Sequence, residues 1–513
     1  MRYNRLTLFF AFASFTSFAQ DPLEDKIADL LSRNDFKDAV PVYRKLIQKH
    51  PENEEYKYQL GKCLLKTHGN RQETIKLLET TIEKRKADAE AFYCMGQAYQ
   101  HDLQFDKAME YYNKAKAISS KSQLAKVERQ IETCLHAKEL IKYPVNVTFF
   151  GLGAPVNSEY ADYFPLIPDD ESFLIFTSRR PGSAAARAEM DGYFPSDIYS
   201  AAPKDGKWTE AKSLGNHINT HFDEEAVGLS PDGKKLTVYV DHIDSSGNLY
   251  LTEPNKTNTG FKKIERLDRK INEGFESTGT INNAGDVFAF SSDRKGGMGE
   301  KDIYIIRKLP NGKWGEPQDL GDHINTKYSE DFPHLSKDGK TIYFASEGHS
   351  SMGGYDLFKC EWKEEEQMWS DPQNLGYPIN DTYDNENISF VGDGAYAYVS
   401  TIKDGGLGDR DIYKIKFNEI DTRYCIITGY VTTSDSVEAA IKISIFATKP
   451  EMKETLKFVP VQKTGKYVMA LTPGDYTLDI KAEGYEEVVT KFVIYDLPFQ
   501  PERSKDFSLK RKQ

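Results

Sequence analysis

Two short stretches of this sequence combine glycines with acidic side chains in a pattern that could hold a phosphate or a metal ion. They are GGLGDRDIY, from Gly405 to Tyr413, and GGMGEKDIY, from Gly296 to Tyr304. A phosphate-binding loop is excluded because neither stretch ends in the GK[ST] of a P-loop. Calcium is a weak alternative, since it needs six or more oxygen ligands and the spacing is not that of an EF-hand. Its candidate ligands are Asp409, Asp411, Glu300 and Asp302. The simpler interpretation is a tight turn whose aspartate accepts hydrogen bonds from local backbone amides.

Paired acidic residues raise the separate possibility of a glycosidase. The pairs lie in FDEE (222–225) and SED (329–331), and Glu276 and Glu386 occupy matching repeat positions. Two carboxylates are the groups that hydrolyse a glycosidic bond. Recurrence in each repeat nevertheless favours a structural role, because catalysis normally needs one unique constellation. The sequence also contains no G-x-S-x-G motif after a strand, and His217 and His323 occupy equivalent repeat positions. We therefore expect no catalytic residue and no cofactor.

The five cysteines do not form a disulfide framework or a zinc motif. They are few, odd in number and without C-x-x-C spacing. We expect buried, apolar thiols, with one disulfide among the first three as an alternative. The cysteines are Cys63, Cys94, Cys134, Cys360 and Cys425.

Length and composition indicate several domains with much β structure. The chain has 513 residues, a formal net charge of −12 and 12% aromatic residues. This length exceeds that of one compact domain. The acidic balance argues against nucleic acid as a partner, because phosphate binding needs clustered basic residues. No apolar stretch of about 20 residues follows the N-terminus, so no membrane-spanning helix is expected.

Residues 1–19 have the pattern of a signal peptide. Arg2 and Arg5 precede the apolar run LTLFFAFASF, and Ser17 and Ala19 are the small residues of a cleavage site. The alternative is a buried N-terminal helix. No cysteine follows the apolar run, so a lipoprotein anchor is not expected. We expect an exported, periplasmic protein.

Residues 20–143 have a helical period with almost no Pro or Gly. In AEAFYCMGQAYQHDLQFDKAMEYYNKAKAI, Gly96 and Ala108 lie where two helices must approach closely. This pattern resembles the tetratricopeptide repeat (TPR), whose period is about 34 residues. Two earlier, weaker copies and a final amphipathic helix around Leu124 to Leu135 predict about three repeats and a capping helix.

The resemblance implies a concave face built from the first helix of each pair. Tyrosine and lysine side chains there could bind an acidic or extended peptide, although a plain solvated face is the alternative. The residues placed in this groove are Tyr58, Lys62, Lys66, Tyr93, Gln97 and Gln100.

Residues 144–420 contain a repeat built from short strands and Gly/Asp turns. Its asparagines stand at 157, 219, 272, 325 and 380, so the intervals are 62, 53, 53 and 55 residues. The recurring S-x-D-G-x-x-[IL]-Y-F-[AS]-S and D-[IL]-[YF] elements resemble the PD40 (WD40-like) repeats of TolB-type β-propellers. We count five blades, with six as the alternative, and expect the early strand LGAPVN, which starts at Leu152, to complete the last blade. Trp208, Trp314 and Trp369 recur once per blade, which favours packing between blades over a sugar platform.

Residues 421–513 alternate apolar and polar side chains, as strands do. The stretch TPGDYTLDIKAEGYE resembles the carboxypeptidase regulatory-like domain, a transthyretin-like β-sandwich whose role is structural or adhesive. The whole chain is thus predicted to be a multidomain α + β protein.

The order of these modules resembles envelope proteins associated with type IX secretion in gliding bacteria. Those relatives carry an OmpA-like peptidoglycan-binding domain after the sandwich, and this sequence ends at Gln513 without one. We expect no direct peptidoglycan binding. The predicted function is a non-catalytic periplasmic scaffold, peripheral to the outer membrane, that binds envelope proteins in secretion, motility or outer-membrane protein assembly. The alternative is a glycan-binding or hydrolytic protein that uses the propeller mouth.

Overall fold

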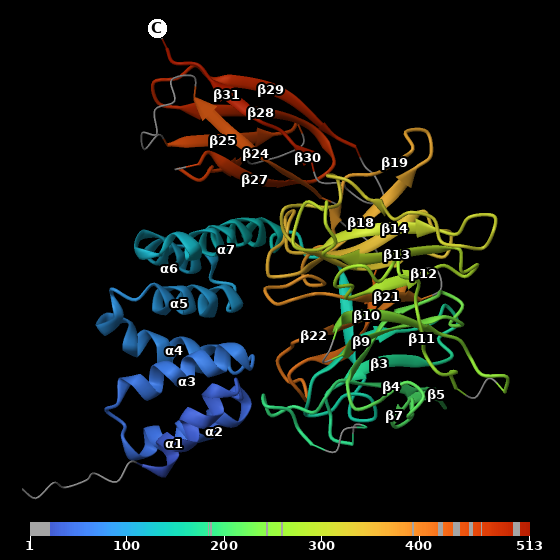
Figure 1. The fold of residues 1–513 in the computed structure, drawn as a ribbon. Coiled ribbons are helices and arrows are strands. Elements are labelled where there is room, and N and C mark those ends of the chain that lie inside the picture. The colour runs from blue at the N-terminus through green and yellow to red at the C-terminus, as the bar shows by residue number, and fades with distance from the viewer. Residues whose placement is uncertain are drawn as a thin grey trace, which may run out of the picture.

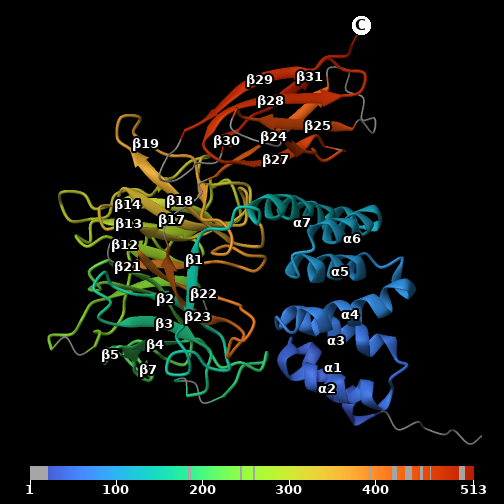
Figure 2. The same cartoon turned by 180° about the vertical axis from the view of Figure 1, so that it is seen from behind.

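A computed structural model describes residues 21–512 except 183, 185–186, 243–244, 258–259, 392–393, 419–423, 434–441, 451–454, 463 and 496–502. The predicted signal peptide and the predicted boundary at residues 420 and 421 lie outside the described residues. A column of helices stands beside a ring of sheets, and a third unit of two sheets lies at one end of both (Figures 1 and 2).

The helical module consists of stacked antiparallel helix pairs followed by one longer helix. Side chains of Asp21, Asp35, Asn53, Asn70 and Asp88 cap the first five helices by accepting backbone N–H bonds. The pairs are α1 (Pro22–Ser32) with α2 (Phe36–Lys49), α3 (Glu54–Lys66) with α4 (Arg71–Ile82), and α5 (Ala89–His101) with α6 (Phe105–Ile118). A 3₁₀ turn, η1 (Glu83–Arg85), follows α4, and α7 (Lys121–Leu140) closes the module.

Small residues permit the close approach of paired helices, as the sequence predicts. A Cβ on Gly96 would lie 2.5 Å from the ring of Tyr112, and one on Gly61 would lie 2.7 Å from Leu78. Ala108 is fully buried. The glycine and alanine positions are therefore set by helix packing.

The described part of residues 147–417 forms five antiparallel sheets, four of them built from one copy of the sequence repeat each and the fifth from the last copy together with β1. Sheet 1 contains β2 (Asp162–Leu166), β3 (Leu174–Ser178), β4 (Asp197–Ala201) and β7 (Lys212–Ser213). Sheet 2 contains β8 (Asp223–Leu229), β9 (Leu236–His242), β10 (Ser245–Thr252) and β11 (Glu265–Arg266). Sheet 3 contains β12 (Gly279–Ile281), β13 (Val287–Ser292), β14 (Asp302–Arg307) and β15 (Gln318–Asp319). Sheet 4 contains β16 (Glu330–Leu335), β17 (Thr341–Ser346), β18 (Asp356–Lys363), β19 (Met368–Trp369) and β20 (Gln373–Asn374). Sheet 5 contains β21 (Ile388–Val391), β22 (Tyr396–Thr401), β23 (Asp411–Phe417) and β1 (Val147–Gly151). A two-stranded hairpin, β5 (Pro203–Lys204) with β6 (Lys207–Trp208), extends from sheet 1.

The sheets close into a propeller ring around a shared axis. The innermost strands β2, β8, β12 and β16 contact one another in sequence, and β2 also contacts β21. The ring centres of Phe164 on β2 and Phe332 on β16 lie 4.8 Å apart, so these two innermost strands pack against each other through their aromatic side chains. The early strand β1 pairs antiparallel with β23, from Val147 opposite Phe417 to Gly151 opposite Tyr413. An early strand therefore completes the last sheet, as predicted, but it is β1, which ends directly before the LGAPVN segment in which the sequence placed it.

The repeated asparagine fastens each sheet to the turn that leads into the next. In each copy, the side-chain amide oxygen accepts from a backbone N–H of the third strand, and the amide nitrogen donates to the carbonyl of the same residue. The pairs are Asn157 with Ile412, Asn219 with Ile198, Asn272 with Leu249, Asn325 with Ile303, and Asn380 with Leu357. The pair formed by Asn157 joins the two ends of the ring.

The C-terminal module packs two sheets around one apolar core. One sheet contains β24 (Cys425–Thr433), β27 (Lys466–Leu471), β30 (Arg503–Ser504) and β31 (Phe507–Leu509). The other contains β25 (Ile443–Thr448), β26 (Leu456–Phe458), β28 (Gly474–Ala482) and β29 (Val488–Ile494). Within the described part of the chain, no helix combines the length and apolar character needed to cross a membrane.

The helix α7 joins all three modules. The apolar cluster around α5, α6 and α7 also includes Met352 from the propeller and Ile426 and Val468 from the C-terminal module. On α7, Glu132 pairs with Lys466 of β27. The three modules therefore meet at one helix.

Candidate functional site

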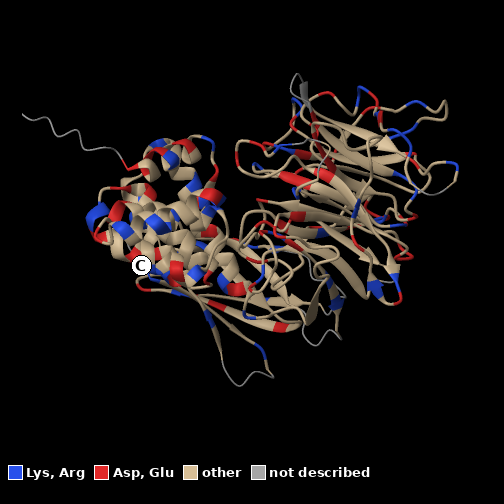
Figure 3. Cartoon of the chain, turned by 90° about the horizontal axis from the view of Figure 1, so that it is seen from below, with Lys and Arg blue, Asp and Glu red and all other residues tan. Residues whose placement is uncertain are grey.

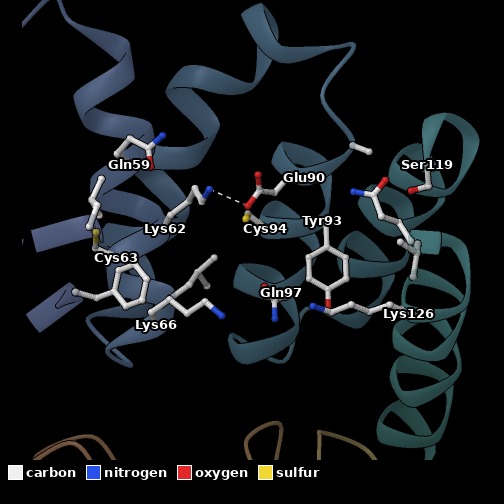
Figure 4. A pocket seen from close by; sticks show the side chains of 16 residues that line it. Gln59, Lys62, Cys63, Lys66, Glu90, Tyr93, Cys94, Gln97, Ser119 and Lys126 are labelled. Carbon is white, nitrogen blue, oxygen red and sulfur yellow. Dashed lines mark ion pairs between the residues drawn. The ribbon is translucent and has the colours of Figure 1, made fainter. Parts of the chain in front are cut away.

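The helical module contains a groove of about 470 Å³ along its concave face (Figure 4). The helices α3, α5 and α7 supply most of its wall, with Leu31 and Phe36 at one end. Four of the six residues that the sequence placed in the groove do line it, namely Lys62, Lys66, Tyr93 and Gln97. Lys62 with Lys66, and Tyr93 with Gln97, are spaced i, i+4 on their helices, which places each pair on one face.

Tyr58 and Gln100 do not face the groove, so this part of the prediction is wrong. Tyr58 is 3% exposed, and the guanidinium of Arg85 lies 3.8 Å from its ring centre. Gln100 is 2% exposed and accepts a 2.6 Å hydrogen bond from the hydroxyl of Tyr112. Each lies one helical turn from a correctly placed residue, but neighbouring structure covers it: Arg85 lies over Tyr58, and the propeller loop at Met352 contacts Gln100.

Helix α7 also contributes to the groove, which the sequence did not predict. Gln123 and Lys126 on this helix line the wall opposite α3, and Gln59, which the sequence did not assign to the groove either, lines the α3 wall. Helical spacing from Val127, the buried residue of the same turn, places Lys126 beside the buried stripe. The position of Lys126 next to a buried residue could therefore have indicated that α7 is more than a capping helix.

The groove favours an anionic ligand. Its lining contains three lysines and one glutamate. Lys62 pairs with Glu90 at 2.7 Å, and the ammonium of Lys126 lies 4.8 Å from the ring centre of Tyr93. Lys66 has no ion-pair partner among the described residues and is exposed. Burial raises the pKa of Cys63 and of Cys94 to about 12, so both thiols are neutral and unreactive at the groove floor.

The glycine-rich loops are turns capped by aspartate. Asp302, Asp356 and Asp411 each accept a hydrogen bond from the backbone N–H four residues earlier, at 2.8, 2.9 and 2.6 Å. The donors are Met298 and Leu407 in the two glycine-rich stretches and Met352 in a shorter related loop, where Gly353 and Gly354 follow it. Local backbone donors thus occupy carboxylate oxygens that a cation would otherwise use.

The four calcium candidates are not gathered into one site. Glu300 and Asp302 belong to sheet 3, whereas Asp409 and Asp411 belong to sheet 5. Asp409 instead accepts a 2.6 Å hydrogen bond from Nδ1 of His68 in the helical module. Over the described residues, no group of three or more His, Cys, Asp or Glu side chains is placed to hold a metal ion.

The repeated acids also form a structural set around the ring. In four copies, a carboxylate accepts from a backbone N–H two or four residues earlier, which fixes the turn entering the sheet. The four are Asp162, Glu224, Glu276 and Glu330. The pKa of Glu224 and the pKa of Glu330 are both raised to about 7. Burial is the main cause, and it outweighs the hydrogen bonds from Thr220 and Thr326, which act to lower the pKa.

The next residue in two of these copies faces a polar pocket of about 300 Å³ at the propeller mouth. Glu225 and Asp331 line it together with Asp223 and Asp241. Burial raises the pKa of Glu225 to about 7, and Tyr163 donates a 2.8 Å hydrogen bond to its carboxylate. Asp331 accepts from Ser277 and Thr278 and pairs with Lys301 at 2.7 Å. Acidic segments of the propeller strands lie on the side facing the helices (Figure 3).

Comparison with known proteins identifies the helical repeat. The tetratricopeptide repeat family model matches residues 30–97, which confirms the predicted repeat there. No curated protein sequence matches the chain.

Solved structures resemble separate parts of the chain. TolB from Acinetobacter baumannii has 17% identity and a TM-score of 0.33, covering 52% of this chain and 57% of its own. MamA from Desulfovibrio magneticus RS-1 has 27% identity and a TM-score of 0.20, covering 22% of this chain and 62% of its own. An endo-arabinase from Bacteroides thetaiotaomicron has 11% identity and a TM-score of 0.34, covering 52% of this chain and 96% of its own. The chain therefore spans less than two thirds of the TolB and MamA structures. It carries tetratricopeptide repeats followed by a β-rich remainder.

Proposed function

We propose that this protein is a non-catalytic scaffold that binds other proteins of the cell envelope through the groove of its helical repeats. Its place is the periplasm, at the periphery of an outer-membrane complex that serves secretion, motility or outer-membrane protein assembly. In this proposal the five sheets are the blades of a five-bladed PD40-type propeller, and the C-terminal module is a transthyretin-like sandwich.

The observation that carries the proposal is the open groove on α3, α5 and α7. Its lining combines an apolar floor with polar side chains that can bond to a peptide backbone. Gln97 projects between Lys66 and Lys126 in this lining (Figure 4). An extended peptide with acidic side chains fits both the shape and the surplus of lysines.

Affinity purification of the tagged full chain after mild crosslinking in envelope extracts tests the proposal. We expect partner proteins to copurify with the native sequence and to be lost with Lys66→Glu, which reverses the charge of an unpaired groove lysine. Lys45→Glu is the matched control, because Lys45 is an exposed lysine on α2 outside the groove. Recovery of the native protein alone, or equal recovery of partners with both variants, would contradict the groove as the binding site.

The acidic pocket at the propeller mouth supports a second candidate, a glycan hydrolase. A carboxyl with a pKa of about 7, as at Glu225, suits a general acid, and a second carboxylate lies in the same pocket. The contacts of Asp331 argue against this residue as the second carboxylate, because two hydroxyls and Lys301 already occupy it, which leaves Asp223 and Asp241 of the same pocket. A polysaccharide hydrolysis screen decides between the candidates: turnover that Glu225→Gln abolishes would establish the enzyme and displace the scaffold.

A further inference from the structure

The helical module contacts the propeller at two ends of very different character. At the α7 end, Met352 is fully buried within the apolar cluster of the helices. Arg129 donates to the carbonyl of Gly348 at 2.7 Å, and Nδ1 of His136 donates to the carbonyl of Ser351 at 3.1 Å. His136 is 2% exposed. We call these contacts to sheet 4 the anchor.

The first two repeats touch the propeller through charged side chains that are partly or largely exposed and through the rings of Tyr160 and Tyr383, of which Tyr383 is 7% exposed and also stacks on His101 of α5. His68 pairs with Asp409 at 2.6 Å, and both side chains are about one-quarter exposed, at 27% and 24%. Arg71 donates a 3.3 Å hydrogen bond to the hydroxyl of Tyr383 and lies 3.9 Å from the exposed Asp404. The ammonium of Lys37 lies 3.9 Å from the ring centre of Tyr160. We call these contacts to sheets 1 and 5 the latch.

The apolar cores show the same division. Among the described residues, the cluster formed by α1, α2 and α3 contains no propeller side chain, whereas the cluster around α7 contains Met352. Separating the latch therefore removes no propeller side chain from the α1–α3 core, whereas separating the anchor uncovers Met352 and leaves buried polar groups unpaired. The two ends must differ in the free energy that holds them.

We propose that the latch is releasable, so that the first two repeats swing away from sheets 1 and 5 while α7 stays fixed on sheet 4. Each partly exposed ion pair changes the closed-to-open equilibrium by no more than about fivefold. Screening shortens the reach of such charges from about 10 Å at 0.1 M salt to about 3 Å at 1 M. The proposal does not depend on what the groove binds.

Latch opening would also couple the groove to the propeller. Lys66 of the groove is two residues from His68 of the latch, near the end of α3. Opening moves this part of the groove wall and uncovers Tyr160 and Asp409 on the propeller rim, while Tyr383 keeps its stacking contact with His101 of α5. The module is thus a hinged cover whose closed state is the one described here.

Hydrogen–deuterium exchange of the full chain at about 50 mM and about 1 M NaCl tests the latch. We expect exchange in residues 66–74 and 402–410 to rise about fivefold or more at high salt, while residues 347–353 at the anchor stay protected. The double variant H68A/R71A should reach the fast rate already at low salt. Arg44→Ala is the matched control, because it removes an ion pair with Glu73 inside the helical module.

Helicity measured by circular dichroism separates opening from unfolding, because an open latch leaves the helices intact. Unchanged helicity with faster exchange at the latch supports the hinge. Equal exchange in the native protein and H68A/R71A, or a loss of helicity that accompanies the faster exchange, would overturn it.

Discussion

At the residue scale, the glycine that follows Met298, Met352 or Leu407 in each glycine-rich loop is required by the neighbouring sheet. A Cβ on Gly299, Gly353 or Gly408 would lie 2.6 Å from a backbone carbonyl oxygen of the next copy in the ring. The three oxygens belong to Thr326, Asp381 and Ser158, each the residue that follows the repeated asparagine. Gly408 makes this contact where the last sheet meets the first. The loops that most resembled a ligand site are thus places of close approach between sheets.

Replacing Gly408 with alanine should destabilise the ring at its closure. We expect Gly408→Ala to lower the free energy of unfolding by about 1–3 kcal/mol, the usual cost of overpacking. Chemical denaturation measures the change. Gly260→Ala is the control, because a Cβ there meets its nearest atom, on Asn255, at 3.8 Å. Equal stability of the two variants would mean that the sheets adjust without cost.

The buried glutamate Glu330 should make stability depend on pH. Burial raises its pKa to about 7, above an unfolded value of about 4.3. Its contribution to stability is therefore full below about pH 4 and is lost as the pH rises through 7. The native protein should lose about 3 kcal/mol relative to Glu330→Gln between pH 4 and pH 8. Urea denaturation across this range measures the difference, and parallel profiles would contradict the raised pKa.

At the element scale, one side chain per repeat links a strand to the turn that follows it. Asn325 is fully buried and bonds both the N–H and the carbonyl of Ile303 on β14, at 2.8 and 3.1 Å. This geometry explains the regular spacing of the asparagines, because an amide alone supplies a donor and an acceptor side by side. Aspartate or leucine at the same position would leave part of the strand unpaired.

Asn325→Ala should cost about 2–4 kcal/mol of unfolding free energy, because it leaves two buried backbone groups without partners. Asn311→Ala provides the comparison. Asn311 is exposed and accepts one hydrogen bond from the N–H of Lys313 in a turn, so its loss should cost less than about 0.5 kcal/mol. Thermal unfolding of both variants measures the difference. A small effect at Asn325 would show that water replaces the amide.

At the scale of the whole molecule, α7 determines how the three modules sit together. It packs in the helical module, donates to carbonyls of sheet 4 through Arg129 and His136, and pairs with the C-terminal module through Glu132. Met352 enters the helical core from the propeller loop that is equivalent to the one bearing Met298. The same loop position is fully buried at Met352 and 50% exposed at Met298.

These two methionines form a matched pair for testing the interface between modules. Met352→Ala should lower the free energy of unfolding by about 2–5 kcal/mol, because it opens a cavity between helices and propeller. Met298→Ala should change it by less than about 0.5 kcal/mol, since an exposed side chain loses few contacts. Helix melting followed by circular dichroism reports the loss. Equal melting of both variants would mean that the modules do not support each other.

The groove shows how far sequence reasoning reaches at a site. Helical spacing placed Lys62, Lys66, Tyr93 and Gln97 correctly, because residues four apart share a face. Helical spacing failed for Gln100 because the propeller loop at Met352 covers this part of α5. A local sequence pattern does not indicate a contact between residues that are 252 positions apart in the chain.

The sequence by itself determined the elements, the tetratricopeptide repeats and the strand that closes the ring. Local packing needs leave a periodic record, such as Gly96 between paired helices and one asparagine in each propeller repeat. Only the tertiary structure decided which surfaces meet. The pair between His68 and Asp409 joins residues 341 positions apart, and each residue alone has the features of an ordinary surface side chain. Contacts between modules depend on the shape and charge of two folded surfaces. Local sequence patterns describe neither surface, because each surface brings together residues that are distant in the chain.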